Sequence, residues 1–261
     1  MRILNSAMLT FLYSSFIYVS SPSVVTASTS DSTSFSDFDS VTESVEYYMD
    51  RYQVTDLGSK IVNNVGNGFE DLYGTRNMRV VLDGLYYRGG GNNYYHRTNK
   101  RKNMNPLPID GLTNLCKDGF GDAVYLYSTR FDTAPKSVSC VTRNGKKNTL
   151  SYQSLVYNEV DKNKLVLEMV YNRIKSNDSR PIYAHCWNGW HASGLLAALS
   201  LRQFCGMSAE NAVDYWVENA DGTADEPGSY EHIKKKIRDY KINGDMKISS
   251  EQKALFCQSA Q

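Results

Sequence analysis

From about residue 79 onward, short apolar runs alternate with amphipathic stretches. Runs rich in β-branched and aromatic residues indicate strands, because such side chains pack well on a pleated surface. These runs lie at 79–82, 85–87, 123–127, 149–157 and 181–184. Apolar residues at helical spacing predict helices at 109–117, 162–175, 194–204, from Ser208 onward and at 230–240. The alternation of strands and helices is typical of an α/β fold whose central, mostly parallel sheet is flanked by helices.

The pattern is weaker elsewhere. Residues 45–64 show patchy helical character, and Asp83-Gly84 between two strand runs predicts a hairpin. Residues 130–148 are polar, and we expect them to be irregular, with a turn at Asn144-Gly145. The tail is polar apart from 254–257, and we assign no element to it.

The first 27 residues differ from the rest of the chain. Arg2 precedes an apolar run at 7–19, and small residues at 25–27 suit a cleavage site. We expect a secretory signal peptide at 1–27, because the run is too short and too interrupted for an anchor. The mature protein would then be exported, periplasmic or secreted, with no membrane span after cleavage.

Residues 28–43 are rich in Ser, Thr and Asp and predict a flexible linker. A single domain would follow at 44–261, with its core at about 80–240. The chain has a net charge of +1, and the segment 1–27 holds one arginine and no acid, so the mature chain would be neutral. This balance points to no nucleic-acid partner.

The richest chemistry lies at 181–194. An apolar strand runs into His185-Cys186, a short loop centred on Gly189 follows, and Ser193-Gly194 opens an Ala/Leu-rich helix. The thiol is thereby placed under a helix N-terminus, where unpaired amides and the helix dipole favour negative charge. We expect this thiol to ionise more easily than a free cysteine, with room for a tetrahedral anion above it.

This stretch resembles the signature loop of the cysteine-dependent protein tyrosine and dual-specificity phosphatases. Their pattern is His-Cys, two residues, Gly, two residues, Arg, Ser/Thr, usually followed by Gly. Five residues are in register: His185, Cys186, Gly189, Ser193 and Gly194. Ala192 stands where the family has the arginine that grips phosphate. The likeness continues at 85–89 and 195–215, and it implies a dual-specificity-phosphatase-like fold with the signature loop between a strand and a helix.

The resemblance assigns catalytic roles. Cys186 would be the nucleophile, His185 would support the thiolate through loop hydrogen bonds, and Ser193 would stabilise the thiolate as it leaves. Asp161, 25 residues before the cysteine, is the candidate general acid, although its place at a helix start favours capping as its role. Asp132 is a second candidate.

The same resemblance assigns anion binding to the loop. The substrate-binding residues would be Trp187, Asn188, Gly189, Trp190, His191 and Ala192, with main-chain amides from 187 to 193 as the cradle. His191 could replace the missing charge if protonated, or it could be a stacking histidine. Arg88 could also reach the cradle, although bracing neighbouring loops is its stronger alternative. The two tryptophans could shape a pocket or pack the loop, and we expect packing for one of them.

Thiolate and imidazole also suit zinc or copper, but His185, Cys186 and His191 lie on one tight loop with awkward geometry. We therefore expect no metal and no cofactor. The basic tract at 96–102 could attract an anionic substrate, although a solvated charged loop is its ordinary interpretation.

Five cysteines would remain in an oxidising destination: Cys116, Cys140, Cys186, Cys205 and Cys257. Four of them could form two disulfides in one of three pairings. We expect Cys186 to stay free, because an anion-stabilising loop needs a thiolate. Cys205 on its Leu-rich helix could instead be a buried small hydrophobe.

Two hypotheses follow. The first is an exported, atypical phosphatase-like hydrolase that acts on a phosphorylated or similar anionic substrate through the Cys186 thiolate. The alternative is a pseudophosphatase that binds an anionic group or a partner protein without turnover, since Ala192 removes the phosphate-gripping arginine.

Overall fold

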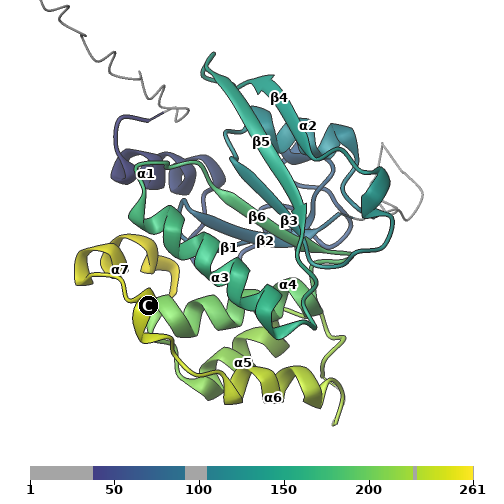
Figure 1. Ribbon diagram of the computed structural model, residues 1–261, viewed down its shortest axis with the longest axis vertical. Coiled ribbons are helices and arrows are strands. Elements are labelled where there is room, and N and C mark those ends of the chain that lie inside the picture. The colour runs from purple at the N-terminus through teal and green to yellow at the C-terminus, as the bar shows by residue number, and fades with distance from the viewer. Residues whose placement is uncertain (1–37, 92–104, 226–227, 261) are drawn as a thin grey trace, which may run out of the picture. The chain divides into compact units, whose positions relative to one another are not determined.

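A six-stranded sheet organises the computed structural model, which describes residues 38–91, 105–225 and 228–260 (Figure 1). The strands are β1 (Arg76–Leu82), β2 (Tyr86–Gly90), β3 (Asp122–Tyr125), β4 (Ser137–Val141), β5 (Lys147–Ser154) and β6 (Ile182–Cys186). Their order is β1-β2-β6-β3-β5-β4. The four inner strands pair in parallel, and β1 and β4 pair antiparallel at the two edges. The predicted α/β fold with a mostly parallel sheet is confirmed.

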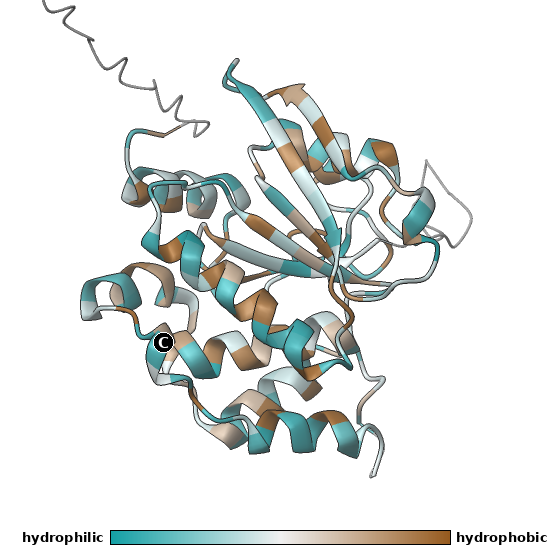
Figure 2. Ribbon diagram, in the orientation of Figure 1, coloured by the Kyte–Doolittle hydropathy of each residue, from teal (hydrophilic) through white to brown (hydrophobic). Residues whose placement is uncertain are grey.

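Seven α-helices accompany the sheet in the described ranges. They are α1 (Val41–Tyr52), α2 (Ile109–Lys117), α3 (Val160–Lys175), α4 (His191–Ser200), α5 (Ala209–Glu218), α6 (Glu231–Asp239) and α7 (Ser250–Phe256). Hydrophobic and hydrophilic residues alternate along α3 and α6, as expected for helices that bury one side (Figure 2). Among the helices of the described ranges, none combines the length and apolar character needed to cross a membrane.

The alternating side chains of β2 show how the two faces of the sheet are covered. The Tyr87 ring packs against Tyr48 of α1 and against Phe120 after α2, with ring centres 6.4 and 5.5 Å away. Arg88, the next residue along the strand, points to the opposite face and reaches Tyr215 of α5. Both faces of β2 are therefore buried, and all five of its residues are buried, Arg88 included.

All described residues belong to one unit, Ser34–Gln261. The predicted signal peptide at 1–27, most of the predicted linker and the basic tract at 96–102 lie outside the described residues. The end of the linker was misplaced: α1 begins at Val41, and the Ser40 side chain caps it by accepting a hydrogen bond from the Glu43 amide. The same helix ends at Tyr52, so the predicted helix over 45–64 was too long.

Two further expectations were wrong, and one helix was missed. β4 lies inside 130–148, which we expected to be irregular, and Asn144-Gly145 forms the turn of its hairpin with β5. α7 lies in the tail, to which no element was assigned. Asp161 does not cap α3, because Glu159 holds the cap position and makes no side-chain capping bond.

Two disulfides join distant segments. Cys116 of α2 is bonded to Cys140 of β4, and Cys205, beyond the end of α4, is bonded to Cys257, next to α7. Cys186 is the free cysteine, as predicted. The alternative of Cys205 as a buried free thiol was wrong.

The Cys205–Cys257 bond closes a 52-residue separation, so removing it enlarges the entropy of the unfolded chain. We expect the Cys205→Ser/Cys257→Ser double variant to lose about 2–4 kcal/mol of unfolding free energy in denaturant titrations under non-reducing conditions. Ser259→Ala is the matched control, because the Ser259 hydroxyl bonds Asp83 at 2.6 Å and anchors the same segment by one hydrogen bond. It should cost only about 1 kcal/mol. Equal losses in the two variants would contradict the prediction.

Candidate active site

Cys186 is the last residue of β6, and four loop residues separate it from α4. Its side chain is 4% exposed, and its Sγ lies 3.4 Å from the Oγ of Ser193, within hydrogen-bonding distance for sulfur. Ser193 is itself fully buried in the first turn of α4. The structure thus places the predicted nucleophile and the predicted hydroxyl together.

The N-terminus of α4 has no side-chain cap. Trp190 occupies the cap position and makes no capping hydrogen bond. The amides of His191, Ala192 and Ser193 in the first turn have no acceptor within the helix, and the helix dipole adds partial positive charge there. The end of α4 beside the thiol is therefore suited to an anion.

The loop carbonyls point toward β1 and β2. The Gly189 carbonyl accepts hydrogen bonds from the Arg88 guanidinium at 2.5 Å and from the Asn77 side-chain amide at 3.3 Å. The Trp187 carbonyl accepts a bond from the Gly91 amide at 3.1 Å. Two strands outside the loop thereby set the orientation of its peptide planes.

This orientation fixes the direction of the loop amides. In a planar trans peptide the N–H points opposite to the C=O. Because the carbonyls of Trp187 and Gly189 face β1 and β2, the amides of Asn188 and Trp190 point to the other side. Main-chain amides that point to one side of a loop can together bind an anion.

Gly189 is required by this geometry. Its φ is +81°, a left-handed conformation, and a Cβ added there would lie 2.8 Å from the carbonyl carbon of Gly89. Asn77, one of the donors to Gly189, also has positive φ, at 50°, where the ladder between β1 and β2 is irregular. The irregularity is what turns the Asn77 side chain toward the loop.

Arg88 braces the loop. It is fully buried, and besides Gly189 it donates to the Tyr215 hydroxyl and to the Asn219 carbonyl, both at 3.2 Å. These acceptors lie on the carbonyl side of the loop. The predicted substrate-binding role of Arg88 does not fit these contacts, and its alternative role as a brace does.

His185 supports the loop as a neutral ring. Its Nδ1 lies 3.0 Å from the Cys186 carbonyl, which can only accept, so Nδ1 carries the proton. Its Nε2 then accepts a hydrogen bond from the Tyr152 hydroxyl at 2.8 Å. Burial lowers the pKa of His185 to about 4. The ring also stacks on Tyr125 and Tyr183, with centres 5.0 and 5.8 Å away.

Tyrosines surround the thiol. Burial, and then the charge of the Cys186 thiolate, raise the pKa of Tyr127. Burial raises the pKa of Tyr125 to about 12, against a lowering hydrogen bond that its hydroxyl accepts from the Trp187 indole at 3.0 Å. These phenols stay neutral at physiological pH and give the site an aromatic wall.

The other loop side chains divide between exposure and packing. Trp187 is 38% exposed beside this wall. Trp190 packs away from it, since its indole donates to Asn64 at 3.1 Å and to Asp221 at 2.9 Å. The Asn188 side chain accepts a bond from Arg76 at 2.8 Å. Packing thus applies to one of the two tryptophans, as expected.

His191 is a stacking histidine. Its ring lies 4.0 Å from that of Tyr230, and its Nε2 is 2.8 Å from the Thr223 hydroxyl. Burial, and then the charge of His232, lower the pKa of His191. A protonated His191 in place of the missing arginine does not fit this environment.

Ala192 is fully buried, and its methyl group brings neither a charge nor a hydrogen-bond donor to the site. In the described part of the chain, Arg76 and Arg88 are the arginines bonded to the loop, and they hold Asn188 and Gly189. Neither of them lies where the phosphatase signature loop would have its arginine, position 192.

The two candidate acids, Asp161 and Asp132, have different surroundings. Asp161 is exposed in the first turn of α3. Asp132 lies in a short 3-10 helix after β3, and its neighbour Phe131 packs on Tyr125 and Tyr152, with ring centres 6.3 and 5.0 Å away. The contacts of Phe131 place its neighbour Asp132 close to the wall along the chain, and Asp132 is exposed, as Asp161 is. No contact with these tyrosines is seen for the residues next to Asp161 in the described part of the chain.

Asn77 and Tyr152 were missed by the sequence analysis. Each acts on the loop across a long sequence separation, 112 residues for Asn77 to Gly189 and 33 residues for Tyr152 to His185. Nothing in their local sequence marks them. In the described ranges no three His, Cys, Asp or Glu side chains are grouped so that they could hold a metal ion.

The sequence matches no protein-family model and no curated protein. Among solved structures, the chain is similar to the core catalytic domain of the PP-IP phosphatase SIW14 from S. cerevisiae, solved in complex with citrate. The identity is 17% and the TM-score is 0.38, over 64% of this chain and 86% of that one.

The buried His185 predicts a pH-dependent stability. Its folded pKa, about 4, lies below the ordinary value of 6.5, so the unfolded chain binds the proton more readily. The stabilisation is complete above pH 6.5 and is lost as the pH falls toward 4. We expect a loss of up to about 3 kcal/mol of unfolding free energy over this range.

The measurement compares denaturant titrations of the parent and of His185→Gln at several pH values. The variant should lack this part of the pH dependence. His232→Gln is the control, because His232 is exposed, and it should change only the part of the profile that depends on its charge beside His191. A parent profile that matches His185→Gln throughout would contradict a neutral, buried His185.

Proposed function

We propose that this protein is exported and that its loop at 186–193 binds a phosphorylated or similar anionic group and cleaves its ester through the Cys186 thiolate. The observation that carries the proposal is the free Cys186 thiol, 3.4 Å from Ser193 and next to an uncapped helix N-terminus. The orientation of the loop carbonyls adds support, since it leaves amides on the other side for an anion.

The proposed reaction has two displacements. The thiolate attacks phosphorus, the S–P bond forms, and the bond to the leaving oxygen breaks while that oxygen takes a proton from an acid. Water then attacks phosphorus and gives a proton to the carboxylate of the acid, the S–P bond breaks, and phosphate is released with the regenerated thiolate. Ser193 donates a hydrogen bond to the departing sulfur.

Asp132 suits the role of acid better than Asp161. The ring of its neighbour Phe131 packs on Tyr125, and Tyr125 also bonds Trp187 of the loop. His185 is unsuited to proton transfer at neutral pH, because its pKa is about 4 and both ring nitrogens are hydrogen-bonded. Its proposed part is to hold the Cys186 carbonyl.

The cysteine pattern supports export. The two disulfides are of the kind that persists in oxidising compartments. A cleaved signal peptide at 1–27 would bring the chain to such a compartment, the periplasm or the medium.

A second candidate function is binding without turnover, by a pseudophosphatase. The observation that favours it is the buried Ala192, with both loop-bonded arginines on the carbonyl side. Loss of one preorganised oxyanion donor typically lowers a rate by about 10²–10³. Loop amides without the guanidinium can still hold an anion or the phosphorylated segment of a partner protein.

Alkylation of Cys186 tests the nucleophile. Iodoacetamide should modify Cys186 in the folded mature protein near neutral pH, and inorganic vanadate should slow the reaction by occupying the amides above the sulfur. Mass spectrometry of the digested protein identifies the modified cysteine. A thiol that reacts only after unfolding, together with anion affinity unchanged in Cys186→Ser, would instead support the binding module.

Ala192→Arg tests whether only the grip on phosphate is missing. The variant should hydrolyse a generic aryl phosphate at least about tenfold faster than the parent, because the guanidinium adds two charge-assisted bonds in the transition state. Because Ala192 is fully buried, circular dichroism must first establish that the variant folds. Cys186→Ser/Ala192→Arg is the control and should be inactive. A folded Ala192→Arg with no gain would argue against a latent phosphatase site.

A further inference from the structure

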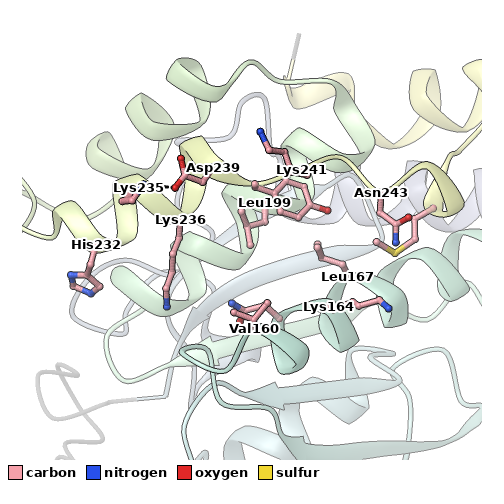
Figure 3. A pocket seen from close by; sticks show the side chains of 13 residues that line it. Val160, Lys164, Leu167, Leu199, His232, Lys235, Lys236, Asp239, Lys241 and Asn243 are labelled. Carbon is pink, nitrogen blue, oxygen red and sulfur yellow. Dashed lines mark hydrogen bonds and ion pairs between the residues drawn. The ribbon is translucent and has the colours of Figure 1, made fainter.

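A cavity lies between α3 and α6, outside the Cys186 loop (Figure 3). Its volume is about 660 Å³, within the range of small-molecule sites. Its apolar lining comes from three parts of the chain: Leu167 of α3, Leu199 of α4 and Met246 beyond α6. At its edge Val160, the first residue of α3, is 76% exposed, which is unusual for a large apolar side chain.

Positive charge surrounds this apolar lining. Four lysines line the cavity, namely Lys164, Lys235, Lys236 and Lys241, against one acid, Asp239. Asp239 is paired with Lys235 at 2.6 Å, and Lys164 is paired with Glu168 of α3 at 3.5 Å. Lys236 and Lys241 have no carboxylate within ion-pair distance in the described part of the chain. The Lys236 side chain extends from α6 toward Val160 (Figure 3).

One polar group of the lining is incomplete. Asn163 is 9% exposed, and its side-chain oxygen is buried with no hydrogen-bond partner among the described residues. An unpaired buried acceptor costs about 1–3 kcal/mol. An anionic head group has no hydrogen to donate to this oxygen, so the lysines and not Asn163 would hold the head group.

We propose that the cavity binds an amphiphile with an aliphatic chain and an anionic head group. The chain would cover Leu167, Leu199 and Val160, and the head group would lie among the lysines, with Lys236 its main partner. The assignment depends on both the apolar area and the positive charge. A neutral apolar ligand would leave the lysines without an anionic partner, and a small anion would leave the apolar lining exposed to water.

Isothermal titration of the folded mature protein tests the proposal with chains of one length and different heads. Decanoate should bind with a stoichiometry of one and at least about tenfold more tightly than decanol or decyltrimethylammonium. Decyl phosphate distinguishes a phosphate head from a carboxylate head. The Cys186→Ser variant should bind decanoate as the parent does, which separates this cavity from the signature loop.

Two surface variants with matched controls locate the site. Lys236→Gln should weaken decanoate binding about fivefold or more, and Lys147→Gln, an exposed lysine of β5, should leave it unchanged. Val160→Asp should weaken it further by adding a negative charge at the edge of the cavity. Val141→Asp is its control, since Val141 is 56% exposed on β4. Equal binding of decanol, unchanged affinity in both cavity variants, or no binding of decanoate would overturn the proposal.

Discussion

The hydrogen bonds that Arg88 and Asn77 donate to the Gly189 carbonyl decide what the loop after β6 can do. A buried guanidinium is costly unless its donors are used, and Arg88 uses them on the loop, on Tyr215 and on Asn219. The same ion therefore ties β2, the loop and the end of α5 into one arrangement. If the Gly189 peptide plane rotated, the Trp190 amide would leave the side opposite to the carbonyls and Arg88 would lose its nearest acceptor. The orientation of the loop amides therefore depends on the packing that holds Arg88 in place.

This arrangement separates two tasks that a single arginine often combines. A guanidinium in the loop would both attract the anion and hold the reacting group through two parallel bonds. Here the nearby guanidinium charges lie on the carbonyl side, so the opposite side of the loop depends on main-chain amides and on the dipole of α4. Helix-end charge effects are worth about 0.3–1 kcal/mol at exposed sites and about 2 in partly buried ones. Such a site can bind an anion. It stabilises the transition state relative to the bound substrate by less than a site with an arginine would.

The parts of the fold that follow from local sequence were predicted well. The apolar run into His185-Cys186, the Asp83-Gly84 hairpin and the free Cys186 depend on patterns a few residues long. β4 escaped prediction because it is an edge strand in which only Val138 is buried, so it has almost no apolar pattern. α7 is seven residues long and is held by its Ser249 capping box and by the disulfide to Cys257. A helix so short has little apolar periodicity of its own.

The side-chain roles at the site could not be predicted in the same way. Whether Arg88 binds a phosphate or a main-chain carbonyl depends on which face of β2 its side chain lies on and on which residues of α5 pack against that face. Burial lowers the pKa of His191, and part of that burial comes from Tyr230, far along the chain, whose ring stacks on it. Local sequence carries no information about such partners. It does carry the residue types, which is why the thiol, its hydroxyl neighbour and a bracing role for Arg88 were predicted, whereas Asn77 and Tyr152 were missed.

Helix α4 explains how an uncapped helix end can persist beside the thiol. A missing cap usually costs about 0.5–2 kcal/mol, yet Trp190 provides none. All residues of α4 after His191 are buried, so its stability comes from burial against the sheet and the outer helices. A helix held in this way does not need its first-turn amides satisfied by its own side chains. Those amides are left available to an external acceptor, and a ligand with oxygens on several sides, such as a phosphoryl group, can satisfy more of them at once than a single capping side chain could.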